Sequence, residues 1–494
     1  MTLQNTPDVT MGLVAVSRDC FPIEISRKRM EQVVAECEKA KVAVIPCSVI
    51  IESEKDAMAA AAEMRDRGVN AVTLYLGNFG PEGPTTIFAK ELGAPFMLCG
   101  AAEESADSLL GGRGDAFCGM LNASLNAGLR NLRPHLPERP VGLPAEVAAM
   151  IAHFTDVARV VVGVRNLKAF SFGPRPQDFY ACNAPIQPLY DLGVEVMENS
   201  ELDLLELYTS LADRKDEIAA IADDMAKELG AGNQHPEKLP QLAQFELALT
   251  TFFEENLGSR QFGVYANKCW PSFEPAFGFV PCYVNSRLAG HGIPVACEVD
   301  IFGAVSEYLC QLASLKPATL LDVNNTVPDN LEIADLAGAG RADLFMGFHC
   351  GNTPSCHLSD AVMKHQLIMH RLMEPDAEPN ITCGTLEGRL RPGPVTVFRL
   401  QGTAKDHLQS YVAEGHVLDA DPCSFGGIGV IGVPNFARFY RHVLLEKRFP
   451  HHTAMGFAHV GGILFDAVRL LGVDDIQAPR PAGRLYPSEN PFCA

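Results

Sequence analysis

The chain has 494 residues, of which 47% are hydrophobic and 20% are charged, a composition typical of globular proteins and not of disordered or fibrous ones. At roughly 150 residues per domain, the length predicts about three domains. The 40 basic and 60 acidic residues give a formal net charge of −20. A surface of this charge repels phosphate backbones and anionic lipids, so we expect neither nucleic acid nor a membrane as a partner.

The cysteines indicate a reducing compartment. Their number, 15, is odd, they are scattered through a long chain, and none forms a C-x-x-C pair, whereas secreted disulfide scaffolds are short and cysteine-dense. The first ten residues lack the basic and apolar regions of a signal peptide, and no apolar run reaches the ~18 residues typical of a membrane helix. We therefore expect a cytoplasmic protein.

The first third alternates strand-like and helix-like patterns. Strands are predicted at 9–17, 41–50, 69–77 and 94–100, with helices at 26–40 and 53–68. Such βα repeats form parallel sheets covered by helices. The glycine-rich GGRGD at 111–115 is not a dinucleotide fingerprint, and the chain contains no phosphate-binding P-loop motif, so we do not expect NAD or ATP.

A second βα series follows the helix predicted at 145–158, and the apolar VVVGV at 160–164 is interpreted as its first strand. Further strands are predicted at 262–270, 293–301, 318–325 and 342–352. The last third is rich in Gly and Pro and strand-like, which is typical of an antiparallel domain or barrel. We predict an α/β protein with two parallel-sheet, Rossmann-like domains (1–155 and 156–335) and a β-rich, barrel-like C-terminal domain (336–494).

Four successive predicted strands end in polar or aromatic residues: Trp270, Glu298, Asp322 and His349. Glu298 and Asp322 are separated by one strand–helix–strand crossover, and neighbouring parallel strands lie about 4.8 Å apart. Because ligands bind at the carboxyl ends of parallel strands, the two carboxylates could share one cation. Alternatively, carboxylates after strands cap the following helix or are solvated.

A third ligand would complete such a site, and His349, His451 and His452 are the candidates. Carboxylate and imidazole ligands suit Mn²⁺, Mg²⁺ or Co²⁺, whereas thiolates would favour zinc. The nearby cysteines are Cys269, Cys297 and Cys350. We interpret them as small core residues, with a cysteine nucleophile as the alternative.

At these residues the sequence resembles the L-fucose isomerase and L-arabinose isomerase superfamily, and most closely its fucose-isomerase-like branch. The resemblance rests on RGDAFCG (113–119), KCWPSF (268–273), PVACEVDIFGA (294–304), LLDVNN (320–325), FHCGNTP (348–354) and HHTAMGFAHVGG (451–462). It implies three domains, aldose–ketose isomerisation and Mn²⁺ as the usual cation. It also implies a homo-oligomer, a hexamer, with sites near subunit interfaces.

Carried over residue by residue, the resemblance makes Glu298, Asp322 and His452 the metal ligands, the last because of its spacing before His459. The arabinose-isomerase branch uses two histidines, which leaves His349 as a further ligand or a supporting group. A cis-enediol mechanism would use Glu298 and Asp322 as the acid/base pair around the planar intermediate.

The substrate expected is a monosaccharide, and the motifs do not identify it. Trp270 would form an apolar wall for the sugar, while His349 and Asn352 could bind its hydroxyl groups. Arg18 and Asn78 follow strands of the first domain and could reach a neighbouring subunit's site, as the resemblance implies. The alternatives are a metal-dependent sugar lyase or epimerase, which share the enediolate chemistry, and a non-catalytic sugar-binding protein.

Overall fold

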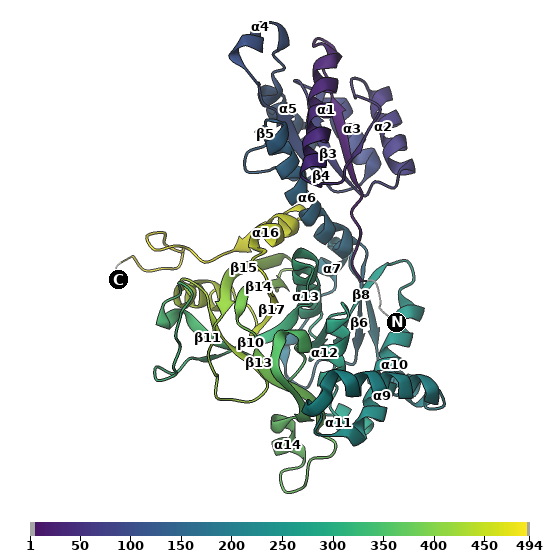
Figure 1. Cartoon of the computed structure of the whole chain (residues 1–494), viewed down its shortest axis with the longest axis vertical. Coiled ribbons are helices and arrows are strands. Elements are labelled where there is room, and N and C mark those ends of the chain that lie inside the picture. The colour runs from purple at the N-terminus through teal and green to yellow at the C-terminus, as the bar shows by residue number, and fades with distance from the viewer. Residues whose placement is uncertain (1–4, 492–494) are drawn as a thin grey trace. The chain divides into compact units, whose positions relative to one another are not determined.

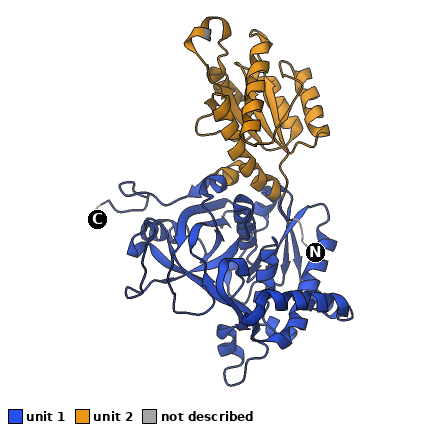
Figure 2. Ribbon diagram, in the orientation of Figure 1, with its two compact units in different colours: residues 1–6, 164–465, 473–494 blue, residues 7–163, 466–472 orange. Residues whose placement is uncertain are grey.

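The computed structural model describes residues 5–491 (Figure 1). These residues form two compact units (Figure 2). Unit 2 comprises Pro7–Gly163 together with Asp466–Gly472, and unit 1 comprises the other described residues. The division into three domains with boundaries after residues 155 and 335 stays a prediction.

Unit 2 is built on a parallel sheet in the strand order β2-β1-β3-β4-β5, one of the common doubly wound arrangements. Its strands are β1 (Met11–Val16), β2 (Ile45–Pro46), β3 (Ala71–Leu76), β4 (Phe96–Ala101) and β5 (Val141–Gly142). Its helices include α1 (Ile23–Lys39), α2 (Glu54–Asp66), α3 (Glu82–Leu92), α4 (Leu109–Gly112) and α5 (Ala116–Leu129). All residues of β1, β3 and β4 are buried, as expected for strands covered on both faces.

The strand predicted at 160–164 is wrong, because helix α6 (Pro144–Arg165) continues through it. Val160, Val161 and Val164 are fully buried, and this packing outweighs the modest preference of valine for strands. α6 is also long and apolar enough to cross a membrane by length and composition alone. However, 61% of its apolar window is buried within the molecule, as in the core helix of a globular protein.

Unit 1 contains a second parallel sheet, in the order β7-β6-β8-β9. Its strands are β6 (Leu167–Phe172), β7 (Glu195–Asn199), β8 (Phe262–Asn267) and β9 (Val295–Cys297). The helices around it are α7 (Gln187–Asp191), α8 (Glu201–Ser210), α9 (Lys215–Leu229), α10 (Leu239–Asn256), α11 (Phe273–Phe277), α12 (Cys282–Gly290) and α13 (Ile301–Ser314). Phenylalanines and tyrosines from this sheet and its helices pack in a large aromatic core.

The C-terminal strands of unit 1 form one large mixed sheet, in the order β12-β13-β16-β11-β10-β17-β14-β15-β18. They are β10 (Thr319–Thr326), β11 (Leu344–His349), β12 (Leu358–His365), β13 (Cys383–Leu390), β14 (Gly393–Gly402), β15 (Leu408–Val417), β16 (Gly427–Gly432), β17 (His452–Gly456) and β18 (Asp475–Gln477). The helices α14 (Leu367–Met373), α15 (Phe436–Phe439) and α16 (Gly461–Leu470) accompany them. β15 also pairs with β16, which closes six strands into a barrel. The predicted fold class, parallel α/β sheets followed by a β-rich barrel-like part, is confirmed.

One predicted topological relation is wrong. Glu298 follows β9 of the parallel sheet, but Asp322 lies within β10, whose ladders with β11 and β17 are antiparallel. The two carboxylates therefore do not end neighbouring parallel strands. β10 belongs to the barrel although it precedes residue 335. The sequence did not reveal this, because an apolar run such as ATLL is compatible with both parallel and antiparallel pairing.

Candidate active site

Glu298 is presented by a strained turn between β9 and α13. Glu298 and Val299 both have left-handed backbone conformations, with φ of 56° and 60°. For residues other than glycine this costs about 1–3 kcal/mol each, and it is rare for a β-branched residue such as Val299. Two residues after Glu298, the side chain of Asp300 caps α13 by accepting a hydrogen bond from the Gly303 N–H at 2.9 Å. The turn thus positions the carboxylate of Glu298 and also that of Asp300, which caps α13.

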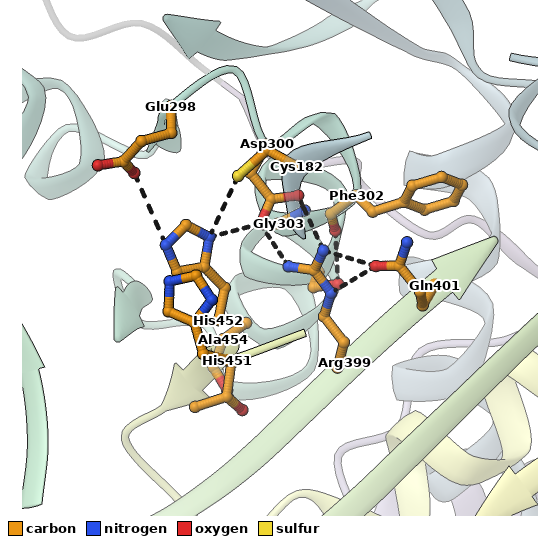
Figure 3. Close-up of polar contacts among 12 residues, drawn as sticks. Cys182, Glu298, Asp300, Phe302, Gly303, Arg399, Gln401, His451, His452 and Ala454 are labelled. Carbon is orange, nitrogen blue, oxygen red and sulfur yellow. Dashed lines mark hydrogen bonds and ion pairs between the residues drawn. The ribbon is translucent and has the colours of Figure 1, made fainter. Parts of the chain in front are cut away.

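Asp322 and His452 face each other across the antiparallel ladder of β10 and β17, so their side chains start from adjacent positions on one face. The Nε2 atom of His452 lies 3.4 Å from Asp322 Oδ1 and 3.6 Å from Glu298 Oε2. The contact between Glu298 and His452 is drawn in Figure 3. The structure therefore brings together the three residues for which the sequence predicts metal binding.

The orientation of the His452 ring is set from its other side. Nδ1 lies 2.8 Å from Asp300 Oδ2, and Arg399 donates to both oxygens of Asp300 at 2.5 and 2.8 Å (Figure 3). Burial alone would raise the pKa of Asp300, but Arg399 and His452 hold it well below its usual value. An ionised Asp300 accepts the Nδ1–H proton of His452, so in the neutral ring the Nε2 lone pair is directed at Glu298 and Asp322. Burial opposes it, but Asp300, Glu298 and Asp322 raise the pKa of His452, so a cation would take the place of a proton on Nε2.

The electrostatics of this group favour a bound cation. Burial raises the pKa of Glu298 to about 7, with Asp322 and Asp300 as further contributors, and burial also raises the pKa of Asp322. Glu298 Oε2 is buried and, within residues 5–491, has no hydrogen-bond partner. Two carboxylate oxygens and one imidazole nitrogen are ligands suited to Mn²⁺, Mg²⁺ or Co²⁺, so Glu298, Asp322 and His452 could hold such an ion.

His349 occupies the same cluster but has the opposite tautomer. Its Nδ1 accepts a hydrogen bond from the Cys350 backbone N–H at 2.9 Å, so in the neutral ring Nε2 carries the proton. Nε2 lies 3.8 Å from Glu298 Oε2, and burial lowers the pKa of His349 to about 3. In this tautomer Nε2 can donate a hydrogen bond, and without its proton it could join Glu298 and His452 as a further metal ligand.

Aromatic side chains lie beside the cluster. The ring of Phe179 contacts the rings of Trp270, His451 and His452, with centroid separations of 6.3, 5.3 and 6.3 Å. His451 Nε2 also lies 3.6 Å from Asp322 Oδ1. Trp270 is thus connected to the cluster through Phe179, and the arrangement offers an apolar surface next to the carboxylates.

Asn352 follows β11 in the FHCGNTP segment. It is buried, and both polar atoms of its side-chain amide lack hydrogen-bond partners within the described part of the chain. A buried amide without partners is costly, so an external hydrogen-bonding group would stabilise it.

Arg18 and Asn78 lie in unit 2, where they contact each other. The Asn78 side chain accepts a hydrogen bond from the Arg18 backbone N–H at 2.8 Å and donates one to the Ser17 hydroxyl at 2.9 Å. The Arg18 guanidinium lies 3.7 Å from Glu82 and 5.4 Å from the centre of the Phe79 ring. The Asn78 side chain therefore stabilises the backbone that follows β1, while the Arg18 side chain remains partly exposed.

The cysteines beside the cluster are poor nucleophiles. Hydrogen bonding and burial raise the pKa of Cys269 well above its usual value, burial does so for Cys350, and the pKa of Cys297 rises to about 12. The Cys269 thiol instead donates to Glu298 Oε1 over 3.7 Å. These contacts support a positioning task for the thiols and give no support to the cysteine-nucleophile alternative.

Sequence reasoning missed the residues behind His452, namely Asp300, Arg399, Gln401, Cys182 and Phe179. The Cys182 thiol lies 3.8 Å from His452 Nδ1, and Gln401 accepts hydrogen bonds from Arg399 at 2.6 and 3.0 Å. Two signals were present: Asp300 stands two residues after Glu298, and Arg399 is a lone charge in the apolar strand VTVFRLQG. A buried charge in such a strand requires a partner.

Two family profiles match the chain. The one described as fucose/sulfoquinovose isomerase, N-terminal domain, matches residues 12–165, and the one described as L-fucose isomerase, C-terminal domain, matches residues 347–477. The second range contains His349, Asn352 and His452.

Among curated proteins, a sulfoquinovose isomerase of Priestia aryabhattai is 23% identical over 489 residues, covering 96% of this chain and 99% of its own. A sulfoquinovose isomerase of Alkalicoccus urumqiensis is 26% identical over 344 residues, covering 68% of this chain and 71% of its own. A third, from Clostridium sp. (strain MSTE9), is 26% identical over 304 residues, covering 59% and 61%. With the paired profiles and the motifs around Glu298, Asp322 and His452, these similarities show that the chain belongs to the fucose-isomerase-like branch of the L-fucose/L-arabinose isomerase superfamily and is an aldose–ketose isomerase.

Proposed function

We propose that the isomerase is metal-dependent, that Glu298, Asp322 and His452 hold the cation, and that the reaction passes through a cis-enediol. The observation that carries the proposal is the convergence of Glu298 Oε2 and Asp322 Oδ1 on the Nε2 lone pair of His452, at 3.6 and 3.4 Å. Mn²⁺ is the cation that the family resemblance implies, and the same ligands would accept Mg²⁺ or Co²⁺.

When bound, the cation would act as a Lewis acid toward the substrate's O1 and O2 and offset the negative charge that develops on them. The proton transfers are assigned to Glu298 and Asp322. One carboxylate removes the proton from C2 while O1 gains a proton, which gives the enediol. Return of a proton to C1 and loss of the O2 proton then give the ketose. Burial raises the pKa of Glu298 to about 7, and a bound cation would lower it, so the carboxylate that transfers the proton would coordinate the cation only loosely.

Three further residues are proposed to position the sugar. The Nε2–H of His349 would donate to a substrate oxygen, and the Asn352 amide would exchange hydrogen bonds with hydroxyl groups, since it lacks partners among the described residues. Trp270, with Phe179, would provide the apolar wall against one face of the sugar.

We propose sulfoquinovose, an anionic sugar, as the first substrate to test, because the relatives that match the chain are named for it. An anionic sugar would favour an arginine partner, but two arginines of the C-terminal part have other partners: Arg389 pairs with Asp360, and Arg391 donates to the Leu358 carbonyl. The experiment is to supply sulfoquinovose, L-fucose, L-arabinose and a common hexose to the protein with Mn²⁺ and to measure the ketose formed. Preferred turnover of a neutral aldose would overturn the substrate proposal and leave the isomerase mechanism intact.

The acid/base assignment is tested by Glu298→Gln, with Glu274→Gln as the matched control. Glu274 is a buried carboxylate without hydrogen-bond partners in the described residues and has no task in the mechanism. Loss of an acid/base group lowers kcat by about 100-fold or more, so we expect this loss for Glu298→Gln and near-normal turnover for Glu274→Gln. A folded Glu298→Gln enzyme with near-normal kcat would overturn the assignment.

We further propose that the protein acts as a homo-oligomer in the cytoplasm. A hexamer is the state that the family resemblance implies. In unit 2, α5 carries Phe117, Leu121, Leu125 and Leu129 on one face, and these side chains are 64% to 77% exposed. Such a continuous apolar stripe on a helix is suited to contact with a second copy of the chain. The free thiols of the described cysteines support a reducing compartment.

A further inference from the structure

A second group of metal-ligating side chains lies within unit 2. It consists of His135, in the segment between α5 and β5, His153 on α6, and Asp466 on α16. One ligand atom of each residue lies within 4.8 Å of the other two. Asp466 is 313 positions from His153 in the sequence and is the first residue of the C-terminal segment that belongs to unit 2.

His135 is held rigidly in this group. Its backbone N–H donates to the Phe96 carbonyl at 2.8 Å, its carbonyl accepts from the Leu98 N–H at 3.1 Å, and its ring stacks on Phe154 with centroids 5.3 Å apart. The residue is 6% exposed, yet its Nε2 atom is buried and has no hydrogen-bond partner within residues 5–491. A buried nitrogen of this kind is costly unless a partner satisfies it.

His153 and Asp466 provide the more open side of the group. His153 Nε2 lies 2.7 Å from Asp466 Oδ2, and the two side chains are 41% and 30% exposed. A proton shared by these atoms occupies the position that a cation would take, and metal binding releases such protons. An ion could therefore enter from solvent on this side and be bound also by a ring nitrogen of His135.

We propose that His135, His153 and Asp466 form a binding site for a divalent ion of the zinc class, with a fourth position open to solvent. Two imidazoles and one carboxylate are ligands typical of zinc, which commonly has three protein ligands and one water. The Glu298–Asp322–His452 group has two carboxylates and suits harder ions. The bound ion would link Asp466 on α16 to His153 on α6 and to His135, whose backbone hydrogen-bonds to β4. The proposal is independent of the isomerase mechanism.

The test compares zinc binding by the metal-depleted wild-type protein with binding by His153→Ala and Asp466→Asn. Both substitutions are at partly exposed side chains, so the variants should fold, which circular dichroism checks. We expect the wild type to retain one more equivalent of Zn²⁺ after dialysis than either variant, with affinity at this site lowered roughly tenfold or more. Co²⁺ should give a stronger ligand-field absorption band in the wild type than in either variant, because cobalt at the Glu298–Asp322–His452 group contributes equally to all three proteins. Zinc bound at the Glu298–Asp322–His452 group is the same in all three proteins, so it does not contribute to the difference in stoichiometry between the wild type and the variants.

Asp156→Asn is the matched control, because Asp156 lies on the same helix one turn from His153 and pairs with Arg159 at 2.9 Å. This variant should bind the same number of Zn²⁺ equivalents as the wild type. Equal stoichiometry in the wild type, His153→Ala and Asp466→Asn would overturn the proposal. The proposal would also be overturned if the wild type bound its extra equivalent of Zn²⁺ only at millimolar zinc, because an isolated histidine–carboxylate pair on a surface could bind zinc that weakly.

Discussion

In His349 and His452, the hydrogen-bond partner of Nδ1 determines whether Nε2 of the same ring is a proton donor or carries the lone pair. In His452 the Nδ1 proton is held by Asp300, which leaves the Nε2 lone pair directed at the carboxylates. In His349 the Nδ1 lone pair is occupied by the Cys350 N–H, so Nε2 is a donor. The ring centroids are 5.7 Å apart, yet we propose that His452 binds a cation and that His349 donates to a substrate oxygen.

This difference gives a prediction for Asp300→Asn. An asparagine amide no longer fixes the Nδ1–H tautomer of His452 by charge, so we expect affinity for Mn²⁺ to fall about 10- to 100-fold, the usual effect of losing the partner of a metal-binding histidine. The substitution also leaves the buried Arg399 without its counter-charge, which costs about 3–5 kcal/mol of stability. The measurements are Mn²⁺ titration and urea unfolding.

The double variant Asp300→Asn/Arg399→Met separates the two effects. It removes both buried charges, so stability should largely return, whereas Mn²⁺ affinity should remain low because His452 still lacks an anionic partner. Recovery of Mn²⁺ affinity together with stability would mean that Asp300 acts only through the packing of Arg399.

Glu274 gives a prediction for pH. It is fully buried, and burial raises its pKa from 4.5 to about 7. The folded protein therefore keeps a proton between these pH values that the unfolded chain has lost, and the free energy of unfolding decreases as pH rises through this window. At about 1.4 kcal/mol per pKa unit, the full effect is about 3 kcal/mol.

The measurement is urea unfolding of the wild type and Glu274→Gln at pH 5 and pH 8. Glutamine does not titrate, so the stability of the variant relative to the wild type should increase toward pH 8 by up to about 3 kcal/mol. A constant difference between the two proteins would show that Glu274 has an ordinary pKa in the folded state.

At the scale of elements, the site is made where a parallel sheet meets a barrel within unit 1. The β9–α13 turn supplies Glu298 and Asp300, and the antiparallel pair β10 and β17 supplies Asp322 and His452. Arg399, on β14 beside β17, joins the two sets through Asp300. Each element therefore contributes at least one ionisable side chain to the cluster, and the cluster in turn links the sheet to the barrel.

Helix α5 gives the prediction at this scale. Replacing Leu121 and Leu125 by Lys places two charges in the exposed apolar stripe, and we expect the oligomer to dissociate while the unfolding of the protomer changes little, because neither side chain is buried in it. Light scattering after size-exclusion chromatography gives the mass. Leu202→Lys, at an equally exposed leucine of α8 in unit 1, is the control, and an unchanged mass for both variants would exclude α5 from the interface.

At the scale of the whole molecule, the order of α/β sheets and barrel could be predicted from the sequence because each has its own pattern of apolar residues and glycines. The valine run at 160–164 could not be assigned, since a buried helix and a buried strand are equally apolar. Glu298, Asp322 and His452 were predicted to lie together although the predicted topology of their strands was wrong. The prediction that carboxylates end apolar strands held for Glu298, whereas Asp322 lies inside a strand and meets His452 through the antiparallel register.

The sequence marks Asp300 and Arg399 as unusual residues, but it does not show that they contact each other and His452. Asp300 and Arg399 are 99 positions apart, and their contact depends on which strands of the barrel are neighbours. The tautomers of His349 and His452 depend on single hydrogen bonds that no sequence pattern records. Residue types therefore predicted which side chains come together, and only the fold shows how they are oriented.

We propose that the isomerisation needs a cation held by Glu298, Asp322 and His452. The most direct measurement is the rate of ketose formation from the preferred aldose by protein depleted of metal with a chelator, before and after addition of Mn²⁺. We predict no detectable ketose from the depleted protein and full activity after Mn²⁺ is restored. A rate that is the same before depletion, after depletion and after Mn²⁺ addition would contradict the account.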